Sequence, residues 1–237
     1  MATVTVTAAP TTESPPASTV EGDQHVVIYN LGWDGYEEML RILDGHSRPQ
    51  MVYLDGNLHL MVTSSIHERR TDRLGTLVRV VVEELDIPCE PTRETTFRRR
   101  DLEAGVQPDD SFYLANHAVM AAKDGKEDVD LNLDPPPDLV IEVVHKHKAD
   151  HAVEVLRRLG VAEVWVGDGD GLRILVLGPD GRYARSETSL AFPFLTAAEI
   201  FGWADRTGMA SATQWIKELR RWVQETLLPR ARGPIQP

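Results

Sequence analysis

The sequence has a single cysteine, Cys89, among its 237 residues. One cysteine allows neither a disulfide within the chain nor a cysteine-rich zinc site, so a reducing compartment is the simplest setting. The chain also lacks any apolar run of roughly 20 residues, the length that a membrane-spanning helix requires. Residues 1–24 contain no arginine and no basic region before an apolar core, so we expect neither a secretory signal nor a transit peptide. The sequence therefore predicts a cytoplasmic protein without membrane association.

Positive charge is also scarce. The chain has 25 Lys and Arg against 37 Asp and Glu, a formal net charge of −12. This balance argues against attraction of nucleic acid to the whole surface, because phosphate binding is normally driven by a basic footprint. Three local clusters oppose the average, over residues 68–73, 92–100 and 145–148. Taken alone, each cluster is equally well explained as the solvated face of an acidic protein.

The chain does contain alternating helix and strand patterns. Apolar residues at helical spacing predict helices over 32–45, 64–85, 151–160 and 213–228, with Ser64 or Ser65 capping the second. Alternating apolar residues predict hairpins over 50–62 and 171–187, and strands over 87–100, 107–115, 138–144 and 162–168. This order predicts an α/β fold with a mixed sheet flanked by helices. We assign 1–24 to a disordered tail, 25–205 to the domain, and 206–237 to a C-terminal helix and tail.

The strand predicted over residues 138–144, DLVIEVV, carries a glutamate at its centre. A carboxylate among valines and isoleucines is costly to bury unless a cation compensates its charge. Asp138 shares a face of this strand with Glu142, but four residues separate the two by roughly 13 Å. The partner must therefore come from another strand, and the best candidates are Asp109 and Asp110, which open the strand after Pro108.

Two arrangements account for these acidic residues. Asp109 and Glu142 could converge from neighbouring strand ends on one hard divalent cation, which would offset their mutual repulsion. Alternatively, Asp109 is a turn residue after Pro108 and Glu142 pairs with an arginine. Spacing alone favours the second arrangement.

Several segments together resemble the Uma family of putative restriction endonucleases, a branch of the PD-(D/E)xK nuclease superfamily. They are TTFRRRDLEAGVQPDDSFYLAN, PPPDLVIEVV, GVAEVWV, GLRILVLGPDGRY and SLAFPFLTAAEI, in unbroken order between about Trp33 and Trp203. The resemblance implies a restriction-endonuclease-like fold and magnesium- or manganese-dependent cleavage of DNA. It also implies that Asp109 and Glu142 hold the metal, with the carbonyl of Val143 as a third ligand.

The sequence departs from the family pattern at the catalytic lysine. In the superfamily, this lysine follows the glutamate by two residues, a position held here by Val144; many Uma members carry it instead on the next helix, where this chain has Ala152. Lys148 lies one helical turn before position 152 and could replace it. Lys146 and His151 are further options. Asp150 could equally cap the helix. Lys148 would then lie before the helix, and the sequence would not predict where its side chain points.

The histidines allow a rival site. His145, His147 and His151 form an HxHxxxH pattern, and neutral imidazoles are favoured ligands of zinc and nickel. Three histidines this close more often line a polar loop than build a site. His67 and Glu68 resemble the family's HER segment and could approach the metal from a helix start. The alternative, a surface pair near the helix cap, is slightly favoured.

The function that we expect is that of a metal-dependent DNA endonuclease. Asp109, Glu142 and Lys148 would be catalytic, and Asp110 would be an additional acidic residue. The arginines that could position phosphate are Arg98, Arg99 and Arg100. The alternative is a catalytically silent protein that keeps the nuclease fold as a binding or assembly module. DNA is the expected partner, and a homodimer is left open.

Overall fold

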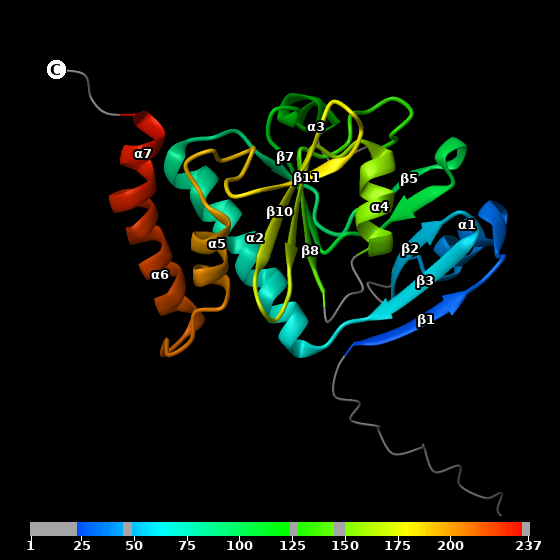
Figure 1. The fold of residues 1–237 in the computed structure, drawn as a ribbon, viewed down its shortest axis with the longest axis horizontal. Coiled ribbons are helices and arrows are strands. Elements are labelled where there is room, and N and C mark those ends of the chain that lie inside the picture. The colour runs from blue at the N-terminus through cyan, green and yellow to red at the C-terminus, as the bar shows by residue number, and fades with distance from the viewer. Residues whose placement is uncertain (1–22, 45–48, 124–127, 145–149, 234–237) are drawn as a thin grey trace, which may run out of the picture.

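The computed structural model describes residues 23–44, 49–123, 128–144 and 150–233, and its strands form two sheets (Figure 1). The antiparallel five-stranded sheet has the order β1 (Gln24–Ile28), β3 (Asn57–Val62), β2 (Gln50–Leu54), β6 (Ala104–Val106) and β5 (Phe97–Arg99). The six-stranded sheet has the order β11 (Tyr183–Ser186), β10 (Leu172–Leu177), β9 (Glu163–Gly167), β8 (Leu139–Val143), β7 (Asp110–Tyr113) and β4 (Glu90–Pro91). Only β8 and β9 pair in parallel among these described strands. The predicted mixed α/β class is confirmed.

Helices cover both sheets (Figure 1). Helix α1 (Gly32–Ile42) packs on the five-stranded sheet, where Trp33 and Tyr36 meet the buried faces of β2 and β3. One face of the six-stranded sheet is covered by α2 (Ser65–Leu85), α5 (Ala197–Ala204) and α6 (Ala212–Trp222). Helix α4 (Asp150–Leu159) packs between the other face and the five-stranded sheet. The remaining helical segments are α3 (His117–Lys123), η1 (Arg100–Leu102), η2 (Val223–Leu227) and α7 (Leu228–Arg232).

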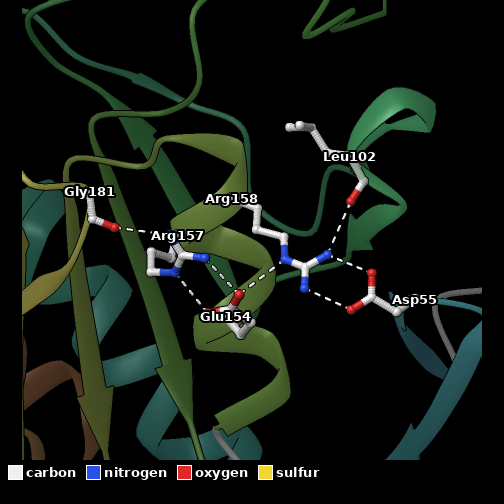
Figure 2. A network of polar contacts seen from close by, with 6 residues as sticks. All are labelled: Asp55, Leu102, Glu154, Arg157, Arg158 and Gly181. Atoms are coloured by element: carbon white, nitrogen blue, oxygen red, sulfur yellow. Dashed lines mark hydrogen bonds and ion pairs between the residues drawn. The ribbon is translucent and has the colours of Figure 1, made fainter.

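A polar network anchors the C-terminal half of α4 to both sheets (Figure 2). Arg158 donates two hydrogen bonds, of 2.6 and 2.7 Å, to Asp55 in the turn between β2 and β3. Glu154 accepts hydrogen bonds from both Arg157 and Arg158, and these bonds lower its pKa to about 2. Arg157 also donates to the carbonyl of Gly181, between β10 and β11, at 2.9 Å. Charge-assisted bonds of this kind fix α4 in its place between the sheets.

Helix α2 carries two features that matter for the site at its start. Ser64 caps it by accepting a hydrogen bond from the backbone N–H of His67, which confirms the predicted cap. Gly75 lies in the middle of the helix, where glycine normally weakens a helix. A Cβ at this position would overlap the carboxylate of Asp110, so the glycine allows close approach of α2 and β7.

The predicted strand over 87–100 is wrong. The segment contributes β4 to one sheet and β5 to the other, with a turn between them in which Arg93 has a positive φ of 51°. The single predicted sheet is therefore two sheets, and the sequence patterns also missed β1, β6, α3 and α5. The predicted C-terminal helix begins as α6, whose Trp215 and Leu219 are buried in one core with α2. No helix within the described ranges is both long and apolar enough to cross a membrane.

Candidate active site

The candidate acidic residues Asp109 and Glu142 lie on adjacent antiparallel strands. Asp109 directly precedes β7, and in the pairing of β7 with β8 Asp110 lies opposite Ile141. The backbone N–H of Val143, the residue after Glu142, donates to Asp109 Oδ2 at 2.6 Å. Both carboxylates are buried, with 6% and 4% exposure respectively. The fold therefore brings together the two residues on which the sequence-based hypothesis rests.

Glu142 is a buried acid with one carboxylate oxygen that has no partner among the described residues. Its Oε1 is buried and has no hydrogen-bond partner, and no arginine pairs with it in the part of the chain that the structure describes. Burial raises the pKa of Glu142 well above its usual range, and the nearby charge of Asp109 raises it further. In this arrangement Glu142 favours its protonated form.

His67, in the first turn of α2, lies against the same residues. Its Nε2 lies 2.6 Å from the carbonyl oxygen of Val143 and 3.2 Å from Asp109 Oδ2. Burial opposes protonation of this imidazole, but the hydrogen bond and charge of Asp109 outweigh it and raise the pKa of His67. A protonated His67 therefore supplies positive charge to Asp109.

Gln50, at the start of β2, is a site residue that the sequence patterns missed. Its Nε2 donates to Asp109 Oδ1 at 2.8 Å, and its side chain is buried. One carboxylate oxygen is thus held by the five-stranded sheet and the other by β8. A glutamine within a strand carries no local signal of such a role, because its partner lies 59 residues further along the chain.

A divalent cation fits some features of this arrangement. The carbonyl of Val143 and the carboxylate of Asp109 already converge on one point, which His67 Nε2 occupies, and Glu142 offers an unpartnered oxygen. A cavity of about 20 Å³ adjoins His67 and Val143. As the described side chains stand, no three His, Cys, Asp or Glu are arranged to hold an ion. A cation could thus use Asp109, Glu142 and the Val143 carbonyl only if His67 moves from that carbonyl.

Asp110 points away from this pair. Its Oδ2 accepts a 2.7 Å hydrogen bond from Arg79 of α2, and Arg79 also lies over the ring of Phe112. Burial raises the pKa of Asp110, against the lowering effect of Arg79. Adjacent residues of a strand face opposite sides, which explains why Asp109 and Asp110 part here.

A comparison with known sequences shows which family the chain belongs to. A family model named Uma2 and described as "Putative restriction endonuclease" matches residues 33–209. The chain belongs to the Uma2 family. Among solved structures it is similar to one titled as a putative nuclease of the DUF820 group from Anabaena variabilis. The two share 16% identity over 66% of this chain and 92% of that one, with a TM-score of 0.47. No curated protein matches the chain.

Ala152, which holds the position that the sequence resemblance assigns to the catalytic lysine, lies in apolar surroundings. Ala152 is buried, with 3% exposure, in a cluster with Val52, Val155 and Leu156. Lys146 and Lys148, the proposed replacements, lie outside the described residues, as do His145 and His147 of the rival metal site. His151 is exposed, and its ring lies on that of His59 on β3, with the ring centroids 4.1 Å apart.

Two of the three arginines that we expected to contact phosphate form ion pairs with carboxylates of the same chain. Arg99 binds Asp101 through two hydrogen bonds, of 2.7 and 2.5 Å, and Arg100 binds Asp34 at 2.5 Å. Arg98 is exposed and lines a cavity of about 370 Å³ on the α1 side of the five-stranded sheet. Glu68, the remaining candidate, is exposed and accepts a hydrogen bond from Thr63.

Proposed function

We propose that this Uma2-family protein is a magnesium- or manganese-dependent DNA endonuclease. The observation that carries the proposal is Glu142, which is buried beside Asp109 with an unpartnered carboxylate oxygen and a raised pKa. Leaving a buried acid in this state costs stability unless a cation compensates it. Membership of a family described as "Putative restriction endonuclease" supports the same chemistry.

The residues have separate tasks under this proposal. Asp109, Glu142 and the Val143 carbonyl hold the ion, which lowers the pKa of the attacking water when bound. Gln50 and the Val143 N–H orient Asp109 from both sides. His67 leaves the Val143 carbonyl and keeps its contact with Asp109. Arg98 contacts the phosphate backbone of DNA, and Lys148 takes the part of the family's catalytic lysine.

Calorimetry with magnesium and manganese tests the site directly. We expect weak binding, on the order of millimolar, because two carboxylates and one carbonyl form a small set of oxygen ligands. Asp109→Asn and Glu142→Gln should each abolish binding. Asp101→Asn, which changes a carboxylate on the surface, is the matched control and should leave binding unchanged. Binding that survives both site substitutions would refute the proposal.

A second function is supported by Ala152. Its burial among apolar side chains leaves no cation at the family's lysine position. A protein of this kind would bind the ion or DNA through the nuclease fold without cleaving it. Incubation of the full chain with manganese and with single- or double-stranded DNA separates the two functions. Cleavage supports the endonuclease, whereas metal binding without cleavage supports the silent module.

A further inference from the structure

Three histidines from three separate elements meet next to the candidate active site, and His25 lines the same small cavity as His67 and Val143. His25 of β1 places its Nε2 3.0 Å from Nδ1 of His59 on β3, and their rings stack with centroids 5.2 Å apart. His151 of α4 covers the other side of His59, at a centroid distance of 4.1 Å and a tilt of 37°. We call these three residues the histidine cluster. It joins the five-stranded sheet to the first turn of α4.

The strand register produces the first pair. In the antiparallel pairing of β1 with β3, His25 lies opposite Met61 and His59 lies opposite Val27. Side chains at such diagonal positions share one face of the sheet and are within reach of each other when they are long or aromatic. The ring of His59 is buried there, with 7% exposure, and that of His25 is half-buried. The pair is therefore held in place by the sheet rather than by a mobile loop.

The chemistry of the histidine cluster differs from that of the acidic pair. Burial, together with the neighbouring His151 and His25, lowers the pKa of His59 to about 4, so this imidazole is neutral near pH 7. Neutral imidazole nitrogens suit zinc, nickel and copper, whereas magnesium prefers oxygen. Zinc binds histidine nitrogen at about 2.0–2.1 Å, so two nitrogens on one tetrahedral ion lie about 3.3 Å apart. The His25 and His59 nitrogens, 3.0 Å apart, need to separate only slightly to reach this distance.

We propose that the histidine cluster binds a divalent transition-metal ion of the zinc or nickel type, separately from Asp109 and Glu142. His25 Nε2 and His59 Nδ1 are two ligands. His151 is exposed, so its ring can turn from its stacked position to become the third ligand, and water completes the shell. This rotation is required, because no three described side chains are arranged to hold an ion as they stand.

An ion at this place would connect β1 and β3 to α4. It would therefore add to the ties between the five-stranded sheet and this helix, which the Arg158 network forms at the opposite end of α4. Ligands that bind only the folded state raise its stability in proportion to their concentration and affinity. This inference does not rest on the proposed endonuclease, since neither Asp109 nor Glu142 contributes to it.

The test uses the full chain carrying Asp109→Asn and Glu142→Gln, so that the acidic pair cannot hold an added ion. After treatment with EDTA and buffer exchange, zinc is titrated by calorimetry, and cobalt is added to follow its visible absorption. We expect about one zinc ion per chain, a higher melting temperature with zinc, and little response to magnesium. His25→Gln and His151→Gln should each weaken zinc binding at least about tenfold.

Two controls make the result decisive. His117→Gln changes a histidine of α3 outside the cluster, whose Nδ1 lies 2.7 Å from the carbonyl of Leu114, and should leave zinc affinity unchanged. The double variant His145→Gln/His147→Gln should also keep zinc binding. Loss of binding in that double variant, with full affinity in His25→Gln, would overturn the proposal and favour the HxHxxxH pattern. The absence of measurable zinc binding would overturn it as well.

Discussion

The backbone N–H of Val143 donates a 2.6 Å hydrogen bond to Asp109 Oδ2, and Val143 directly follows Glu142. The contact holds the end of β8 against the residue that opens β7. Both carboxylates are buried there. Asp109 has hydrogen-bond partners, whereas Oε1 of Glu142 has none among the described residues. Five predictions follow from this arrangement and from the helices around it.

Glu142→Gln should stabilise the protein at neutral pH in the absence of metal. The pKa of Glu142 is higher in the folded state, so the stability it contributes is present below about pH 4.5 and is lost as the pH rises through the folded pKa. Glutamine carries no charge and avoids this loss, so we expect the free energy of unfolding to rise by about 1–3 kcal/mol at pH 8. Urea denaturation with EDTA between pH 4 and pH 8 measures it. A gain of equal size at pH 4 would contradict this explanation.

His67→Gln should destabilise the protein most at low pH. The pKa of His67 is raised in the folded state, so its contribution is complete below about pH 6.5 and disappears as the pH rises through the folded pKa. Hydrogen bonds to charged groups contribute about 1.5–3 kcal/mol, and we expect a loss in this range near pH 6. Urea denaturation of the variant and the wild type at pH 6 and pH 9 measures this loss, which should be smaller at pH 9. An unchanged loss at pH 9 would mean that the charge of His67 has no role.

Gly75→Ala should destabilise the protein although alanine favours helices. An added Cβ would overlap Asp110 Oδ2 and lie 2.6 Å from Arg79 Nη1, so the ion pair between α2 and β7 must shift. We expect a loss of about 1–3 kcal/mol, as for overpacking in a core. Gly202→Ala in α5 is the matched control, because its Cβ would meet no atom within 4 Å. Gly202→Ala should be neutral or should stabilise the protein by roughly 0.5–1 kcal/mol. Thermal unfolding of both variants and the wild type measures these differences.

Ala152→Lys places a lysine where the sequence resemblance assigns the catalytic lysine, and it should raise DNA cleavage with manganese. A lysine beside the scissile phosphate offsets charge in the transition state, an effect worth several kcal/mol and therefore orders of magnitude in rate. Ala152→Met is the control, since it adds similar length without charge to the same buried position. Equal activity of the two variants would show that the ammonium group is not the missing element.

Lys148→Ala distinguishes the two proposed functions when it is compared with the wild type. If Lys148 has replaced the family's lysine, the wild-type protein cleaves and this change lowers the rate by orders of magnitude without loss of stability. If the wild type is inert and Ala152→Lys gains activity, the silent module is correct. Robust cleavage that is insensitive to Lys146, Lys148 and His151 substitutions would contradict both functions.

The sequence alone determined the local elements, because periodicity and capping act over short distances. It predicted α2 with its Ser64 cap, the hairpin of β2 and β3, and the strand that carries Glu142. The opposite directions of Asp109 and Asp110 could also have been predicted from the alternation of side chains along a strand. The segments that resemble the Uma family occur in the same order along the chain as these predicted elements.

The tertiary structure decided which of these elements meet. The turn at Arg93 sends one predicted strand into two sheets, and no local pattern announced that break. Gln50 reaches Asp109, and His25 reaches His59 and through it His151, across 34 or more residues of chain. Such contacts depend on sheet order and register, which follow from packing of the whole core rather than from any one segment. The site therefore combines an acidic strand visible in the sequence with partners that only the fold brings to it.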